Sequence, residues 1–199
     1  WDCRSSNKKL SKQYMIITYD QKNSNVKILQ LLLKYFGYKI SADGSYGPQT
    51  KEVILNFQKE NGLKMDGIVG PVTMWRFSEK DKLLSSIMKI ESNGDDNIIG
   101  DLKLTNKAYG CLQIRQGVVD EVNTKLKTSF IAEECYGNRI LSLLIWYTYW
   151  IIYPGRDDED KAKSWNGGPA WRRYYGKPGK ETYTKNLDLY WSKVKKLLN

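Results

Sequence analysis

Apolar residues recur at helical spacing along several segments of the chain. In residues 25–38 the apolar side chains fall at positions i, i+3, i+6 and i+7, and therefore on one helix face: Val26, Leu29, Leu32 and Leu33. Asn25 is a suitable N-cap for this helix, and Gly37 is a suitable residue to end it. Similar spacing predicts helices over 48–61, from 71 onward, over 81–91 and around 187–194. The pattern predicts a mainly α fold.

The pattern Asp-Gly-x-x-Gly-Pro-x-Thr occurs twice, as DGSYGPQT at 43–50 and as DGIVGPVT at 66–73. Its glycines permit backbone conformations that other residues resist, and its proline suits the first turn of a helix, where a missing N–H costs nothing. Asp43 and Asp66 can accept backbone N–H bonds within their turns. We interpret each copy as a turn that begins a helix, with a structural aspartate.

Residues 24–78 thus form a predicted three-helix unit. The segments LQLLLKYFGY, DGSYGPQT, VILNFQKENGL and DGIVGPVTMWRF resemble the three-helix peptidoglycan-binding module of cell-wall hydrolases. The resemblance implies binding to cell-wall peptide or glycan, with Tyr38 and Tyr46 as candidate groove residues. Residues 1–23 are expected to form an extended arm. The charged segment EKDK at 79–82 is expected to be a linker to a second domain over 82–199.

The chain contains no histidine among its 199 residues. This excludes Ser-His and Cys-His nucleophile pairs and zinc sites with histidine ligands, so acid–base chemistry must use carboxylates, Tyr, Lys or Cys. The cysteines, Cys3, Cys111 and Cys135, lack metal-binding spacing. A Cys111–Cys135 disulfide and buried thiols both remain open, and buried thiols are favoured. We expect no metal and no cofactor.

The formal net charge of +10 favours attraction to polyanions such as nucleic acid or acidic wall polymers, or serves solubility alone. No segment combines a basic stripe with a nucleic-acid motif, so we expect no nucleic-acid partner. The apolar run 140–153 is too short for a bilayer, which needs about 20 residues, and Pro154 and Gly155 end it. We predict a buried helix, no membrane insertion and a monomer. No signal peptide is visible, and because the chain begins at Trp1 we expect a processed N-terminus.

Glu91 falls on the apolar face of the helix predicted from residue 81, in register with Leu84, Ile87 and Met88. Burial there disfavours the charged carboxylate and raises its pKa, which is what a general acid for glycosidic cleavage requires. The residues Ser92, Asn93 and Gly94 end the helix directly after it. Glu91 is therefore expected at the mouth of a loop, where catalytic groups are common.

Three further segments follow Glu91 in order: AYGCLQI at 108–114, SWNGGP at 164–169 and a late tyrosine, Tyr183. Together they resemble the lysozyme-like fold of lytic transglycosylases and goose-type lysozymes, over roughly 82–195. The resemblance implies that Glu91 is the general acid and that Gly110, Gln113 and Ile114 form a glycine–glutamine strand. It also implies that Asn166 and Gly167 form a loop, although Trp165 stands where the family usually has Tyr.

The same resemblance implies roles in substrate binding. Gln113 and Asn166 would bond sugar hydroxyl or acetamido groups, and Tyr183 would orient the acid or the N-acetyl group. Tyr109 and Trp165 would stack on sugars, with core packing as an equal alternative for each. The closing segment is rich in lysine, which is expected to form a solvated face.

The predicted reaction is cleavage of the β-1,4 bond between N-acetylmuramic acid and N-acetylglucosamine, at the cell wall outside the cytoplasm. An inverting hydrolase needs a second carboxylate ~6.5–9.5 Å away, for which Asp95, Asp96 and Asp101 are candidates. Asp101 resembles an aspartate of the goose-type lysozymes, and on this resemblance hydrolysis is favoured. Asp95 and Asp96 are expected to be solvated, and Arg115 stands where the family has a further aspartate. The alternatives are a lytic transglycosylase, which needs no second carboxylate, and a non-enzymatic wall-binding protein. A phage endolysin and a bacterial autolysin would share these features.

Overall fold

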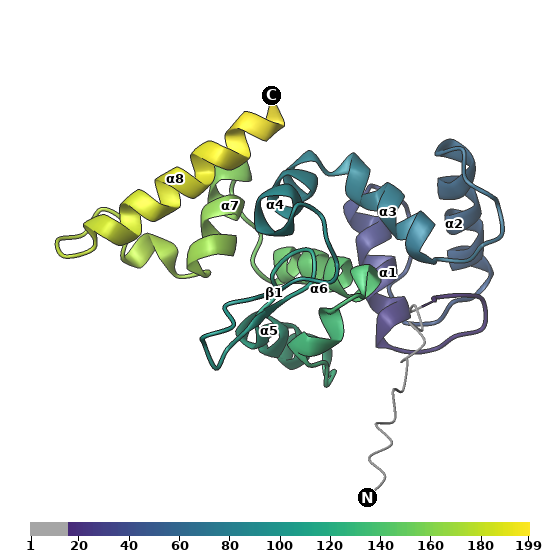
Figure 1. Cartoon of the computed structure of the whole chain (residues 1–199). Helices are drawn as coiled ribbons and strands as arrows, with labels where there is room; N and C mark the ends of the chain where they lie inside the picture. Colours follow the sequence, from purple (N-terminus) through teal and green to yellow (C-terminus); the bar gives the residue numbers. More distant parts are fainter. Residues whose placement is uncertain (1–15) are drawn as a thin grey trace, which may run out of the picture.

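The computed structural model describes residues 16–199, and this part of the chain is mainly helical, as predicted. The helices are α1 (Ser24–Tyr35), α2 (Pro48–Glu60), α3 (Pro71–Lys80), α4 (Lys82–Ser92), α5 (Gln116–Leu126), α6 (Arg139–Ile152), α7 (Asp158–Gly167) and α8 (Glu181–Leu198). Two short strands, β1 (Ile99–Gly100) and β2 (Ala108–Tyr109), pair antiparallel, and 3-10 turns occupy Ala132–Cys135 (η1) and Trp171–Arg173 (η2). In Figure 1, α6 lies centrally, and α7 and α8 lie at the end opposite α2.

The predicted helix boundaries of the N-terminal unit hold at most positions. Pro48 and Pro71 are the first residues of α2 and α3, and Gly37 follows α1 with φ +88°. The predicted N-cap of α1 was wrong by two residues: Asn23 caps it, and its side chain accepts from the Val26 N–H at 3.1 Å. The apolar stripe of α1 is fully buried.

A buried glutamine holds each copy of the repeat. The Nε2 of Gln30 donates to Asp43 at 2.9 Å, to the Ser45 carbonyl at 2.9 Å and to Thr50 at 3.0 Å, and its Oε1 accepts from the Gly44 N–H at 2.8 Å. The turn aspartate also accepts from the Ser45 N–H at 2.8 Å, which confirms its structural role.

Gln58 repeats this arrangement in the second copy. Its Nε2 donates to Asp66 at 2.9 Å, to the Ile68 carbonyl at 3.1 Å and to Thr73 at 3.4 Å, and its Oε1 accepts from the Gly67 N–H at 2.9 Å. Asp66 accepts from the Ile68 N–H at 2.9 Å. The doubled motif is therefore one structural device used twice: a helix-borne glutamine fixes the turn that begins the next helix.

The two tyrosines expected in a groove lie in different surroundings. Tyr46 is 1% exposed, and its hydroxyl donates to the Gly67 carbonyl at 2.6 Å, so its expected place in a groove is wrong. It joins the two turns instead. Tyr38 is half-buried; its ring packs edge-on to Phe57 and its hydroxyl donates to Glu60 at 2.6 Å.

The expected charged linker is absent, because α3 ends at Lys80 and α4 begins at Lys82. Asp81 alone joins them, and its carboxylate accepts from the Leu84 N–H at 2.9 Å as the N-cap of α4. The two units share one apolar core, in which α1 and α3 pack on α6 and the rings of Phe36 and Tyr147 meet edge-on at 5.7 Å. The N-terminal unit is thus held directly against the second unit.

The expected N-terminal arm is described only from residue 16, and residues 1–15 lie outside the described part of the chain. Ile17 is 1% exposed and exchanges two backbone hydrogen bonds with Val69, at 3.0 and 2.8 Å. This part of the arm therefore pairs with the second repeat turn.

The apolar run at 140–153 forms α6, whose residues 140–150 are all buried, as predicted. No helix in residues 16–199 has the length and apolar character needed to cross a membrane. Cys111 and Cys135 are buried free thiols, as favoured from the sequence, and Cys3 lies outside the described residues.

Candidate active site around Glu91

Glu91 lies in the last turn of α4, as predicted. Asn93 ends the helix in the left-handed conformation, with φ 58°. Ser92 lies between Glu91 and Asn93. Its hydroxyl donates to the Cys111 carbonyl at 2.8 Å and accepts from the Gly94 N–H at 3.1 Å. These bonds anchor the end of α4 to the segment that follows β2.

The nearest partner of Glu91 comes from the closing helix. The Tyr190 hydroxyl of α8 donates to Glu91 Oε1 at 2.6 Å, and the tyrosine is only 8% exposed. The resemblance implied that Tyr183 orients the acid or the N-acetyl group, and it gave no indication of Tyr190. The available signal was the stripe of Leu187, Tyr190 and Val194, which places the hydroxyl on the buried face of α8.

Burial raises the pKa of Glu91 above its ordinary value, because removal from water disfavours the carboxylate. The hydrogen bond from Tyr190 and the positive charge of Arg115 act in the opposite direction, and the negative charge of Asp101 adds to the increase. The net effect is a raised pKa of Glu91. A carboxyl group in this state can hold a proton closer to neutral pH and donate it, as a general acid must.

Asp101 is ion-paired with Arg115 in this structure. The Arg115 side chain also donates to the Asn106 carbonyl at 2.9 Å, so it ties the segment between β1 and β2 to the start of α5. Asp101 itself has a left-handed backbone, with φ 54°. Arg115 stands where the family has a further aspartate. It is therefore paired with the carboxylate of Asp101, the candidate base.

The glycine–glutamine segment forms a tight turn, not the expected strand. Gly110, with φ +70°, and Gln113, with φ 50°, lie between the bridged residues Tyr109 and Ile114. The Gln113 Nε2 donates to the Gly110 carbonyl at 2.9 Å, and its Oε1 lies where a Cβ on Gly100 would be. The amide of Gln113 is thus already bound within the hairpin. Tyr109 is half-buried against the core.

A side chain on Gly110 has no room. An added Cβ would lie 2.5 Å from the carbonyl oxygen of Cys135, a backbone atom that cannot move aside cheaply. The left-handed backbone disfavours other residues there as well.

The asparagine–glycine segment is the last turn of α7 rather than the expected loop. Trp165 packs among Trp146, Tyr149 and Trp150, with its ring centroid 4.6 Å from that of Trp146, which supports its packing alternative. Asn166 is exposed.

Gly167 lies directly against α8. The Tyr183 hydroxyl donates to the Gly167 carbonyl at 3.0 Å, and an added Cβ on Gly167 would lie 2.6 Å from that hydroxyl. Tyr183 therefore holds α8 against α7. The hydrogen bond to Glu91 is made by Tyr190 instead.

Asp96 is not a solvated loop acid as expected. It forms an ion pair with Arg139 at the start of α6, with oxygens 3.0 and 3.1 Å from Nε. The same guanidinium donates to the Gly94 carbonyl at 2.6 Å and lies 4.5 Å from the ring centroid of Trp75 in α3. Arg139 thus links the loop after Glu91 to both units.

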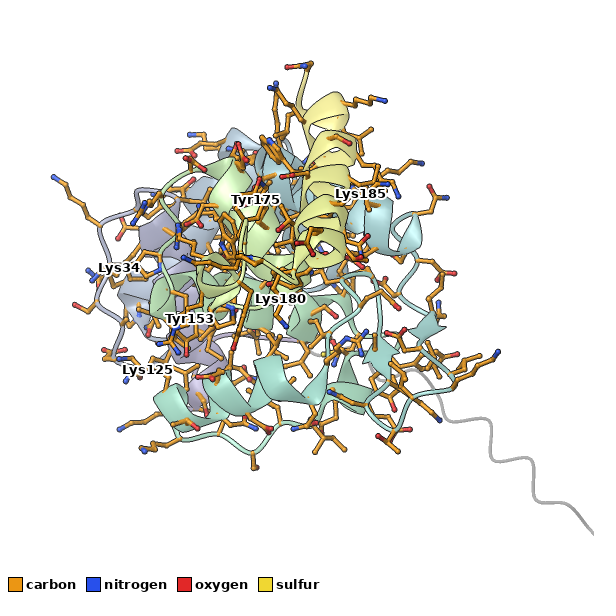
Figure 2. The ribbon with its side chains drawn as sticks, turned by 90° about the vertical axis from the view of Figure 1, so that its left-hand side faces the viewer. Lys34, Lys125, Tyr153, Tyr175, Lys180 and Lys185 are labelled. Atoms are coloured by element: carbon orange, nitrogen blue, oxygen red, sulfur yellow. The ribbon has the colours of Figure 1, made fainter. Side chains whose placement is uncertain are left out.

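The basic charge is spread over the molecule. In Figure 2, Lys34, Lys125, Lys180 and Lys185 lie well apart on the face shown. Within residues 16–199 no cluster of three or more His, Cys, Asp or Glu side chains could hold a metal ion.

Comparison with known proteins identifies the N-terminal unit. Residues 22–75 match the family described as putative peptidoglycan binding domain. A probable N-acetylmuramoyl-L-alanine amidase of Bacillus licheniformis is 39% identical over 72 residues, which cover 35% of this chain and 20% of that protein. A zinc D-Ala-D-Ala carboxypeptidase of Streptomyces albus G is 36% identical over 61 residues, which cover 28% of this chain and 24% of that protein. The chain thus spans about a fifth to a quarter of the length of these relatives.

Among solved structures, the crystal structure of Burkholderia AP3 phage endolysin aligns over 93% of this chain and 97% of that chain. The TM-score is 0.32 and the identity 15%, too low to establish a shared fold. The match over residues 22–75 confirms the predicted resemblance of the N-terminal unit to the peptidoglycan-binding module found in modular peptidoglycan-degrading enzymes.

Proposed function

We propose that the chain is a cell-wall-degrading enzyme that cleaves the β-1,4 bond between N-acetylmuramic acid and N-acetylglucosamine in bacterial peptidoglycan. The observation that carries the proposal is Glu91: a carboxyl group at a helix end, with a pKa raised by burial and a bond from a buried tyrosine. A general acid for glycosidic cleavage needs a raised pKa, and the tyrosine bond holds the carboxyl group in place. The peptidoglycan-binding segment supports the substrate, and with it a place of action at the wall.

In the proposed reaction, protonated Glu91 donates its proton to the bridging oxygen as the glycosidic bond breaks. The sugar on the muramic acid side then carries the positive charge of an oxocarbenium-like state. Tyr190 holds the Glu91 carboxyl group in one orientation and stabilises the carboxylate that remains after proton transfer.

The group that attacks next distinguishes two outcomes. Hydrolysis requires a base to activate water, and Asp101 is the candidate. Its ion pair with Arg115 stabilises the carboxylate but occupies it, which favours the alternative outcome, attack by the muramyl 6-hydroxyl. The second candidate function is therefore a lytic transglycosylase, with a 1,6-anhydro product.

Asp101→Asn separates these outcomes when the products of purified peptidoglycan are analysed by mass spectrometry. If Asp101 activates water, we expect reducing muramic ends in the wild type and their loss in the variant. If the 6-hydroxyl attacks, we expect anhydro ends from both proteins at similar rates. A variant that keeps producing reducing ends at the wild-type rate would rule out Asp101 as the base.

The relatives are named as an amidase and a carboxypeptidase, so cleavage of an amide or peptide bond is an alternative to glycosidic cleavage. An amidase would release peptides and a carboxypeptidase would release D-alanine; both would leave glycan strands intact, and the same mass spectra would reveal it. A wall-binding protein without activity would release neither product. Nucleic-acid binding predicts retention on DNA at ~200 mM salt, where a purely ionic association weakens steeply.

A further inference from the structure

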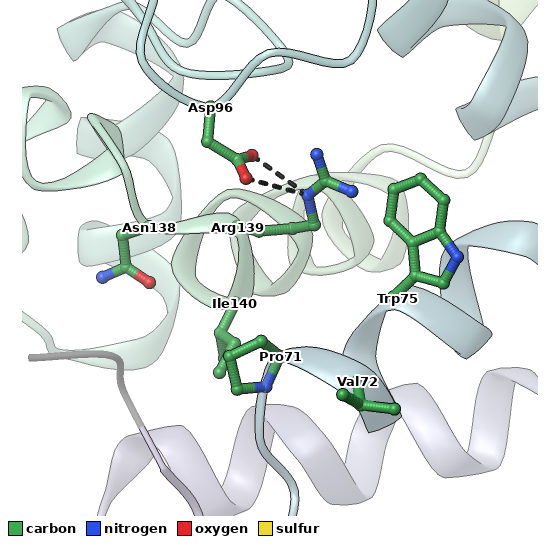
Figure 3. Close-up of a pocket in the computed structure, with 7 residues that line it drawn as sticks. All are labelled: Pro71, Val72, Trp75, Asp96, Asn138, Arg139 and Ile140. Atoms are coloured by element: carbon green, nitrogen blue, oxygen red, sulfur yellow. Dashed lines mark hydrogen bonds and ion pairs between the residues drawn. The ribbon is translucent and has the colours of Figure 1, made fainter. Parts of the chain in front are cut away.

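Two hollows lie where the peptidoglycan-binding unit meets the second unit. The first, shown in Figure 3, has a volume of about 550 Å³, and the second about 170 Å³. Trp75 of α3 lines both. Val72, near the start of α3, lines the first, and Asn93 and Gly94, at the end of α4, line the second. We call the two hollows together the junction groove.

The indole of Trp75 is held in place and yet remains open. The guanidinium of Arg139 lies 4.5 Å from the ring centroid, and Arg139 is itself fixed by Asp96 and by the Gly94 carbonyl. Figure 3 shows this guanidinium between the carboxylate and the indole. The tryptophan nevertheless stays 45% exposed. A fixed, exposed aromatic face is a suitable platform for the apolar face of a sugar ring.

The charges along the groove balance. Asp96 and Arg139 neutralise each other in the first hollow, and Glu79 and Lys89 carry opposite charges in the second. A polyanion such as nucleic acid would instead need an excess of cationic side chains. A neutral chain of hydroxyl and acetamido groups suits this lining, to which Asn138 adds an amide.

The groove is lined by both units. Its α3 wall belongs to the matched family segment, which extends to Trp75. Its other wall includes Lys89 and Asn93 of the α4 end, on a different face of the helix from Glu91, whose carboxyl group meets Tyr190 of α8. We infer that the junction groove binds the N-acetylated glycan strand of peptidoglycan, with Trp75 as the stacking platform. This inference rests on the proposed function and adds a substrate-binding site to it.

The test is calorimetric titration of the whole chain with the β-1,4-linked hexamer of N-acetylglucosamine, in a Glu91→Gln background that prevents turnover. Trp75→Ala removes the platform, and Val72→Arg places a charged side chain at the rim, where Val72 is 69% exposed and folding is not at risk. We expect Trp75→Ala to raise Kd by about tenfold, the loss of one good aromatic contact, and Val72→Arg to raise it by a similar factor because the added side chain obstructs the groove. Tyr19→Ala is the matched control, because Tyr19 is 49% exposed and lies in the N-terminal arm; its Kd should not change.

Unchanged Kd in both groove variants, or no binding of the hexamer at all, would overturn the inference. Each failure can be attributed separately. If Glu91→Gln degraded peptidoglycan at the wild-type rate, the proposed function would fail while the titrations still decided the groove. If Trp75→Ala and Val72→Arg bound the hexamer like their parent, the groove would fail while the chemistry at Glu91 stood.

Discussion

Replacing Gln58 by Leu should unfold the N-terminal unit at a much lower denaturant concentration. Gln58 is 1% exposed and makes four hydrogen bonds, to Asp66, the Ile68 carbonyl, Thr73 and the Gly67 N–H. Leucine preserves much of the volume but none of these bonds. The loss of unfolding free energy therefore measures how much Gln58 stabilises the second repeat turn.

The structure sets the size of the effect. Gly67 is buried, so without Gln58 its N–H has no partner, at a cost of about 1–3 kcal/mol. The bond to the charged Asp66 contributes about 1.5–3 kcal/mol more. Thr73 still donates to the Ile68 carbonyl at 3.1 Å, so that carbonyl keeps a partner. Allowing on the order of 1 kcal/mol for the added apolar contact of leucine, we expect a loss of about 1.5–5 kcal/mol.

Equilibrium unfolding in urea, followed by tryptophan fluorescence and circular dichroism, measures this loss. Gln30→Leu in the first copy should show a similar effect, because Gln30 is also 1% exposed and makes the equivalent four bonds. Gln49→Leu is the control, since Gln49 is exposed, and should change stability by less than about 0.5 kcal/mol. A loss below about 1 kcal/mol for Gln58→Leu would refute the structural reading of the repeat.

Two further predictions concern the site. Tyr190→Phe removes the bond that favours the Glu91 carboxylate, so the pKa of Glu91 should rise further; the alkaline limb of the pH–rate profile, where a general acid loses its proton, should move to higher pH. An unmoved limb, or a Glu91 carboxyl resonance that titrates at the wild-type pH in NMR, would contradict this assignment. Gly110→Ala should cost about 1–3 kcal/mol more stability in thermal unfolding than Gly62→Ala, because both glycines have positive φ but only Gly110 has an atom within 4 Å of the added Cβ. Equal costs would mean that the crowding at Gly110 is relieved.

Burial of Glu91 also fixes the sign of its effect on stability. Its folded pKa is raised, so the folded protein holds this proton more tightly than the unfolded chain does. The contribution of Glu91 to folding is therefore most favourable below the unfolded pKa and declines as the pH rises through the raised folded pKa. Activity through a general acid declines in the same direction.

Local chemistry predicted the helix boundaries well. Pro48 and Pro71 begin their helices because proline fits the first turn, and Gly37 ends one because it adopts a left-handed conformation. Asn23 and Asn25 both satisfy the rule for an N-cap, and sequence spacing alone does not separate them. Such signals act within one turn of helix, which is why they can be read from the sequence.

Contacts between distant segments were not predictable in the same way. Glu91 was placed correctly, because its helical register is local, but its partner Tyr190 is 99 residues further along the chain. The charged segment at 79–82 predicts a linker. In the structure α3 and α4 both pack on the shared core, and Asp81 between them is the N-cap of α4. Arg115 gave no signal that it would bind Asp101, because that pairing depends on how the hairpin folds back.

The most direct test of the central claim is Glu91→Gln, with purified peptidoglycan as substrate and mass spectrometry of the released material. Glutamine keeps the size of the side chain but has no acidic proton to donate. We expect the wild type to release glycan fragments that end in muramic acid, in reducing or anhydro form, and the variant to release none above background. Fragments from the variant at the wild-type rate, or free peptides with intact glycan strands from the wild type, would contradict the claim.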